Sequence, residues 1–237
     1  MNSLDEIYKD FGDGDFDHFY FRCNLHYLRG LFTQGTRVLE LSTNIESTKI
    51  LSQLAASVVT VDGSSEKIEK IKELGLPNVT AICSMFEDYT PLEKFDLIIM
   101  FRALEHLPNP TESLKHIKSF LEKDGILAVA VPNGTSLHRC IGSQLGMLPY
   151  PMHLTDADVR KGHYRVYNAL TLNGVLKIAG FEPLQTWGSF LKMVSDRQMK
   201  DNPQIYTPEM MQALFRVSQL MRPEDCAELV TIVRHKE

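Results

Sequence analysis

The spacing of apolar positions along residues 37–62 changes from that of a strand to that of a helix and back to that of a strand. The rest of the chain is organised around this stretch. A β-branched apolar run, RVLEL, is followed by the polar stretch STNIE and then by STKILSQLAA, in which Ile50, Leu51 and Leu54 share one helical face. A second apolar run ends on Asp62. This order predicts a strand, a helix and a parallel strand, and ligands of such sheets bind at the carboxyl ends of the strands.

The same alternation continues along the chain and predicts an α/β fold with a mostly parallel, seven-stranded sheet and helices on both faces. The helix that begins at Pro110 should place Leu114, Ile117 and Leu121 inward and end at Lys123-Asp124-Gly125. The last strand, AELVTIVR, is expected to be antiparallel at the inner edge of the sheet. Other strands are expected at residues 79–83, 95–100, 126–131 and 181–187, and other helices at 64–74, 136–148, 169–179 and from 207.

The segment FDHFYFRCNLHYLRGLF is amphipathic and predicts a helix before the first strand, carrying Phe16, Phe19, Tyr20 and Leu28. This helix either covers the edge of the sheet or closes over a ligand. In the second case Tyr8 and Phe19 supply aromatic surface.

Length and composition suit one α/β core, because the chain has 237 residues of which 43% are apolar. We expect a helical cap at residues 1–35 and a Rossmann-like domain at 36–237, with a loop-rich insertion at about 133–168 on the substrate side. A formal charge of −5 disfavours nucleic acid as partner. The four cysteines show no CxxC spacing, and no apolar run is long enough to span a bilayer. We therefore expect a cytoplasmic protein without a membrane or metal partner.

Asp62 suits a ribose, since a carboxylate after the second strand can accept hydrogen bonds from both hydroxyls. Ser42, Asn44 and Glu46 stand where a nucleotide-binding loop normally carries glycines. A side chain at the first of these places either blocks the ligand or requires an unusual backbone conformation. Glu46 suits the start of a helix. The glycine-free LELSTNIE disfavours a nicotinamide-dependent Rossmann enzyme, which would carry GxGxxG there.

A series of motifs, in order, resembles the class I S-adenosylmethionine-dependent methyltransferases. LEL, VDGS, CSMFEDY, FDLIIMFRALEHLPNP and KDGILAVAVPN match from Arg37 to Asn133, and each motif taken alone is weak. The later segments SLHRCIGSQLGML, GHYRVY, AGFEP and FLK resemble a bacterial small-molecule branch of the family. The resemblance implies a Rossmann-like methyltransferase fold, S-adenosyl-L-methionine as cofactor and a small-molecule methyl acceptor.

The resemblance also implies roles for particular residues. His106 in ALEH would face the methyl acceptor. The loop after the first strand would lie against the methionine half of the cofactor, Asp62 would hold the ribose, and Phe101 and Arg102 would lie beneath the sulfonium. The implied cofactor-binding set is Glu40, Ser42, Asn44, Asp62, Gly63, Ser84, Met85, Phe86, Phe101 and Arg102.

Methyl transfer to a hydroxyl or an ammonium needs alignment, exclusion of water and a group that accepts a proton. Histidine suits that role near neutral pH. His163, in GHYRVY, is the first candidate and His106 the second, and His138 and His153 are further candidates. The alternative for His106 is a helix-capping or supporting role, and for His163 a supporting role is equally compatible. No HxH or HExxH spacing occurs, so no metal site is expected.

Basic side chains in the second half of the chain could pair with an acidic group of the acceptor. Surface solvation explains Arg139 equally well, and core packing explains Tyr167 and Phe190. The expected substrate-binding set is Tyr8, Phe19, Asn133, His138, Arg165, Tyr167 and Lys192.

Two functions follow from these observations. The first is a cytoplasmic methyltransferase that acts on an oxygen or nitrogen of a small polar metabolite. The second is a non-catalytic partner with the same fold that stabilises or regulates an active relative. The glycine-free STNIE loop is the observation that favours this second function. A homodimer or pairing with a related methyltransferase is compatible with either.

Overall fold

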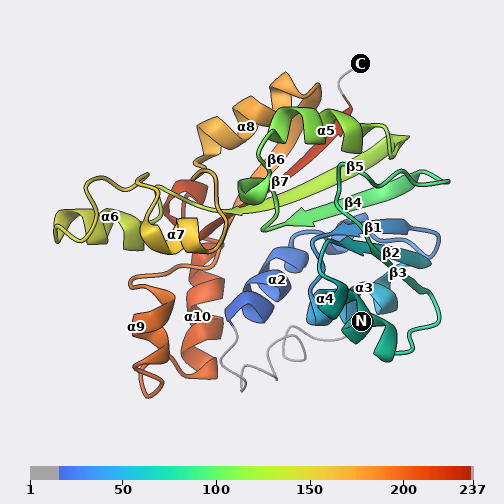
Figure 1. Ribbon diagram of the computed structural model, residues 1–237. Coiled ribbons are helices and arrows are strands. Elements are labelled where there is room, and N and C mark those ends of the chain that lie inside the picture. Colours follow the sequence, from blue (N-terminus) through green and yellow to red (C-terminus); the bar gives the residue numbers. More distant parts are fainter. Residues whose placement is uncertain (1–15, 236–237) are drawn as a thin grey trace.

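A computed structural model describes residues 16–235 and contains one seven-stranded sheet in the order β3-β2-β1-β4-β5-β7-β6 (Figure 1). Strands β1 to β5 pair in parallel, whereas β7 pairs antiparallel with both β5 and β6. The predicted mostly parallel sheet with an antiparallel last strand is therefore confirmed, with β6 rather than β7 at the outer edge. The strands are β1 Arg37–Leu41, β2 Ser57–Asp62, β3 Val79–Cys83, β4 Phe95–Phe101, β5 Leu121–Pro132, β6 Phe181–Ser189 and β7 Glu228–His235.

Helices cover both faces of the sheet, as the alternating pattern predicted. Leu114 and Leu172, on α5 and α8, pack in the apolar core on one face, and Phe21 and Leu51, on α2 and α3, pack in the core on the other. No helix among residues 16–235 is both long and apolar enough to cross a membrane. The helices are α2 Phe16–His26, α3 Ile45–Leu54, α4 Ser65–Glu73, α5 Pro110–Lys118, α6 Leu137–Gln144, α7 Asp156–Arg160, α8 Ala169–Ile178, α9 Asp196–Lys200 and α10 Pro208–Ser218, with short 3₁₀ turns η2 Arg29–Leu31, η3 Leu104–His106 and η4 Pro223–Asp225.

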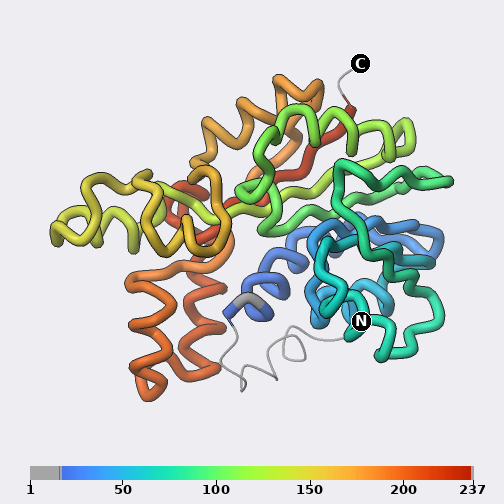
Figure 2. The backbone as a smooth tube through the Cα atoms, viewed as in Figure 1, coloured from blue at the N-terminus to red at the C-terminus, as the bar shows by residue number. Residues whose placement is uncertain are grey.

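The first described helix, α2, packs on a face of the sheet and not on its edge. Phe21 lies 5.9 Å from Phe101 of β4, measured between ring centroids. The other side of α2 joins a third apolar cluster with α9 and α10, which follow much later in the chain (Figure 2). Phe19 and Phe190 are in edge contact in this cluster, with ring centroids 5.0 Å apart. The expectation that this helix covers the edge of the sheet was wrong. Its apolar side chains pack instead against one face of the sheet and against α9 and α10.

The segment after α5 differs from the prediction. The helix ends at Lys118, and Leu121 pairs with Phe95 as the first residue of β5, so Leu121 is buried in the sheet instead of on a helix. The register shifts between Phe95 and Leu97, and a Cβ at Gly125 would come within 3.0 Å of the Phe95 carbonyl oxygen. The glycine that was expected to end the helix therefore permits a close approach of two strands.

Candidate functional site

A cavity of about 660 Å³ opens at the carboxyl ends of β1, β2 and β4. Its walls come from the loops that follow these strands, from α4, from α2 and from the turn after α7. The predicted site residues that line it are Ser42, Asn44, Asp62, Gly63, Met85, Phe86, Arg102, His106 and His163. Side chains from five separate segments therefore meet where the sheet topology predicts a ligand.

The loop after β1 keeps its shape without glycine. Ser42 has φ of 71°, in the left-handed region that glycine enters without a steric penalty. Asn44 caps α3, because its side-chain oxygen accepts hydrogen bonds from the backbone N–H groups of Glu46 and Ser47 at 3.0 and 3.3 Å. The unusual backbone conformation expected at the first glycine place is thus present, and serine adopts it.

Glu46 does not line the cavity. Its carboxylate pairs with Arg22 of α2 at 2.8 Å and with Lys49 of α3 at 3.1 Å. These two cations and the N-terminus of α3 explain why the pKa of Glu46 lies below its ordinary value although burial acts in the opposite direction. The third glycine place of the family therefore holds a side chain that ties α3 to α2.

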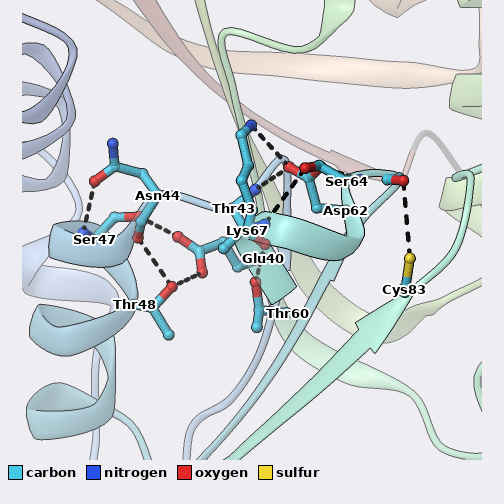
Figure 3. Close-up of polar contacts among 11 residues, drawn as sticks. Glu40, Thr43, Asn44, Ser47, Thr48, Thr60, Asp62, Ser64, Lys67 and Cys83 are labelled. Atoms are coloured by element: carbon cyan, nitrogen blue, oxygen red, sulfur yellow. Dashed lines mark hydrogen bonds and ion pairs between the residues drawn. The ribbon is translucent and has the colours of Figure 1, made fainter. Parts of the chain in front are cut away.

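Glu40 lies beneath the loop and is 1% exposed. Its carboxylate accepts hydrogen bonds from the hydroxyls of Ser47 and Thr48, the latter at 2.6 Å (Figure 3). Burial raises the pKa of Glu40 to about 7. Glu40 is not part of the cavity wall. It supports the loop from behind by holding the first turn of α3.

Asp62 lies at the end of β2 with its carboxylate already in use (Figure 3). One oxygen, Oδ1, accepts a hydrogen bond from the Ser64 backbone N–H at 2.8 Å. The other, Oδ2, accepts from the Thr43 backbone N–H at 3.0 Å and from the Lys67 ammonium at 3.1 Å. Since each carboxylate oxygen has two acceptor positions, a hydroxyl of a ligand can reach Oδ1 directly but must displace Lys67 to reach Oδ2.

The loop after β3 supplies an apolar wall to the cavity. A Cβ at Gly63 would lie 2.8 Å from the Met85 sulfur, so the absence of a side chain at Gly63 lets Met85 approach the β2 loop. Phe86 lines the same wall. The hydroxyl of Ser84 donates a hydrogen bond to the Met85 carbonyl oxygen at 2.9 Å, and Ser84 is not part of the cavity wall.

Phe101 and Arg102, adjacent at the end of β4, face different surroundings. Phe101 is fully buried in the core behind Phe21, and it is Phe21 that lines the cavity. Arg102, with φ of 52°, lines the cavity and forms an ion pair with the buried Glu228. Phe101, which was predicted to lie beneath the sulfonium, is not part of the cavity wall, because its ring packs against Phe21 in the apolar core.

His106 and His163 meet at one end of the cavity. Their ring centroids are 4.7 Å apart and the rings are perpendicular. Nδ1 of His163 lies 3.7 Å from a carboxylate oxygen of Asp158. Burial lowers the pKa of both rings, and proximity to His106 adds to the effect on His163, whose pKa is about 4. The sequence named both residues, and the structure brings them together although 57 positions separate them.

Most of the residues expected to bind substrate lie away from this cavity. Asn133 donates to the backbone carbonyls of Glu224 and Cys226, each at 2.8 Å. Arg165 donates to the Pro108 carbonyl at 2.9 Å and to the Leu107 carbonyl. Both side chains therefore hold loops together, and neither lines this cavity.

The remaining described members of that set are core residues or polar groups that are at least partly buried. Lys192 pairs with Asp196 at 2.9 Å and is 8% exposed. The His138 ring nitrogen Nδ1 lies 3.0 Å from the Ser136 hydroxyl, and burial lowers the pKa of His138 to about 2. Tyr167 belongs to the apolar core, Phe19 to the cluster with α10, and Tyr8 falls outside the described residues.

Several residues of the cavity wall were not expected from the sequence. Lys67 lies in the first turn of α4, five residues after Asp62. Its place at the start of the helix that follows a ligand-binding strand is a sequence signal that could have identified it. Other unexpected residues of the wall carry no comparable local signal, among them His18, Phe21, Lys70, Glu87 and Lys161.

Comparison with known proteins gives a consistent result. A family model described as "Methyltransferase domain" matches residues 16–186. The ubiquinone biosynthesis O-methyltransferase of Glaesserella parasuis serovar 5 (strain SH0165) is 31% identical over 142 residues, which cover 52% of this chain and 58% of that protein. The (S)-coclaurine N-methyltransferase of Papaver somniferum is 26% identical over 113 residues, 45% of this chain and 32% of that protein. The chain spans about half the length of the curated relatives it matches.

Among solved structures, the plantazolicin methyltransferase BamL, in complex with a triazolic desmethylPZN analog and SAH, has a TM-score of 0.61 at 16% identity. The alignment covers 94% of this chain and 88% of that one. At this identity the likeness concerns the fold, and it extends beyond the sheet to almost the whole chain.

Proposed function

We propose that this chain, which belongs to the class I S-adenosylmethionine-dependent methyltransferases, transfers a methyl group to an oxygen or nitrogen of a small polar acceptor. The observation that carries the proposal is the cavity of about 660 Å³ at the strand ends, with Asp62 on one wall and the His106–His163 pair on another. The curated relatives are named as O- and N-methyltransferases, which supports both choices of acceptor atom.

The residues present fit S-adenosylmethionine. The cavity volume lies within the roughly 300–1,000 Å³ of small-molecule sites. The Glu46 side chain is turned toward Arg22 and does not line the cavity. Asp62 would accept the ribose hydroxyls, Met85 and Phe86 would contact the adenine, and the backbone from Ser42 to Asn44 would lie against the methionine part.

The cofactor, when bound, supplies an electrophilic methyl carbon on a positively charged sulfur. The chain's own part is to align the acceptor with that carbon and to exclude water. His163 and His106 lie on the cavity wall and can accept the acceptor's proton. Lys161 and Arg102 line the same cavity and suit an acceptor with a negatively charged group.

Titration calorimetry and thermal unfolding with S-adenosylhomocysteine test the cofactor part of this proposal. We expect heat of binding and a rise in Tm, because a ligand of the native state stabilises it by mass action. Asp62→Ala should weaken binding by about 10- to 100-fold, the effect of losing hydrogen bonds to a charged group. Asp124→Ala, an exposed residue at the amino end of β5, is the matched control.

His163→Ala should slow methyl transfer, measured as release of S-adenosylhomocysteine with a panel of hydroxylated and amino small molecules, and should leave cofactor affinity unchanged. An unchanged rate would remove His163 from the reaction. If the wild-type chain gives neither heat nor a Tm shift with S-adenosylhomocysteine, the enzyme proposal fails and the non-catalytic partner takes its place.

A further inference from the structure

Glu105, His106 and His163 form a compact group of potential metal ligands at the edge of the cavity. One ligand atom from each lies within 4.8 Å of the other two. Glu105 is 1% exposed, and the His163 side chain is 7% exposed. The backbone holds the two segments together, since the Tyr164 N–H donates to the Glu105 carbonyl oxygen at 2.9 Å.

We propose that these three side chains bind a divalent transition-metal ion of the Zn²⁺, Co²⁺ or Ni²⁺ type. Two imidazoles and one carboxylate are a ligand set that such ions accept, and three protein ligands leave one coordination position open. This inference concerns the site itself, and it replaces the expectation of no metal that rested on local sequence spacing. The ligands come from η3 and from the turn after α7, so no short motif contains them.

The groups around the two imidazoles support this role. Nδ1 of His163 lies 3.7 Å from Asp158, which leaves Nε2 available to a cation. Asp158 is itself fixed, because its carboxylate accepts hydrogen bonds from the backbone N–H and the hydroxyl of Thr155 at 3.0 and 2.8 Å. His106 is hydrogen-bonded to the Gly162 backbone. Such outer contacts orient imidazoles for metal binding.

Distances and charges are compatible with a bound ion. Ligand atoms about 2.1 Å from a tetrahedral ion are about 3.4 Å apart, so the group must close by at most about 1.4 Å. Lys161 and Arg102 are nearby cations that would repel a bound metal ion. Arg102 is paired with Glu228, and the carboxylates of Glu105 and Asp158 oppose the positive charge of Lys161. Side-chain rotation can supply a movement of this size.

The open coordination position would face the cavity, because both His106 and His163 line it. With a cation bound, the two imidazoles are ligands and cannot accept a proton from the acceptor. The cation would then lower the pKa of an acceptor hydroxyl bound to it. This last step rests on the proposed function, whereas the cation site does not.

Titration of the untagged protein with Co²⁺, without S-adenosylmethionine, tests the site by a readout other than activity. We expect one Co²⁺ per chain with visible absorption, and competition by Zn²⁺ in calorimetry. Glu105→Gln and His163→Ala should each weaken Co²⁺ binding by more than tenfold, and Asp158→Asn by about tenfold. His153→Ala, in the loop before α7, is the matched control and should leave the affinity unchanged.

Thermal unfolding and S-adenosylhomocysteine binding of the same variants show whether each one is folded. Because Glu105 is buried, Glu105→Gln alone is not decisive. Asp158→Asn, at a side chain that is 18% exposed, and His163→Ala keep the test valid. Absence of the Co²⁺ spectrum in the wild-type chain, or undiminished affinity in folded His163→Ala, overturns the site. Normal S-adenosylhomocysteine binding without Co²⁺ binding would refute the metal site and leave the methyltransferase proposal intact.

Discussion

The buried carboxyl of Glu40 should make the stability of this protein fall as pH rises. Its pKa is about 7 in the folded chain and 4.5 in its ordinary state, a difference that corresponds to about 3.4 kcal/mol. Between these two values the folded chain binds more protons than the unfolded chain. The contribution is therefore fully present below about pH 4.5 and is lost as pH rises through 7.

About 2.5 kcal/mol of this contribution should disappear between about pH 5 and about pH 8. Glu40→Gln removes the ionisable group and nearly keeps its shape, so the free energy of unfolding of the wild type relative to the variant should fall by that amount over the same range. Urea unfolding at each pH, without cofactor, measures it through the fluorescence of Trp187, the single tryptophan of the chain, which is stacked on Tyr27.

Glu69→Gln, an exposed site on α4, is the matched control for general effects of pH and charge. If the difference between wild type and Glu40→Gln does not change with pH over this range, the pKa of Glu40 is not raised in the folded protein. The conclusion that burial raises the pKa of this carboxyl would then be refuted.

Three substitutions test other parts of the site. Ser42→Gly should raise the free energy of unfolding by about 1 kcal/mol, because φ of 71° no longer strains a side chain; urea unfolding that shows no gain would contradict the strain. Lys67→Met should tighten S-adenosylhomocysteine binding by about fivefold, measured by calorimetry, since a freed position on Asp62 adds about one hydrogen bond, and weaker binding would instead make Lys67 a cofactor contact. Arg22→Met should destabilise the chain by about 1.5–3 kcal/mol by removing the 2.8 Å pair with Glu46, in contrast to the exposed Arg222→Met, and equal unfolding curves for the two variants would mean that the Arg22–Glu46 pair does not stabilise the packing of α2.

The sequence located the strands and helices well wherever the pattern was local. The run that ends on Asp62 and the helix at residues 169–178 were readable because side-chain period depends on neighbours a few residues away. The pattern was misleading at residues 118–125, where Leu121 has a helical spacing from Ile117 and belongs to β5 instead. Pairing with Phe95, which is distant in the sequence, decided that case.

The site was only half readable for the same reason. Residues directly after strand ends, such as Asp62, Gly63 and Arg102, line the cavity because parallel strands bring their carboxyl ends to one edge. Residues in the loop-rich second half, such as Asn133, Arg165 and Lys192, have the chemistry of a binding site but form contacts inside the protein. Their side-chain type could not tell these two roles apart.

The sequence by itself determined the sheet, the family and the position of Asp62, because these follow from the periodic burial of side chains and from short motifs. Only the tertiary structure decided that Ser42 adopts a left-handed backbone, that Glu46 turns toward Arg22, and that Glu105 and His106 meet His163. Those outcomes depend on which distant segments pack against one another. The energy of that packing cannot be inferred from the residues of any one local segment.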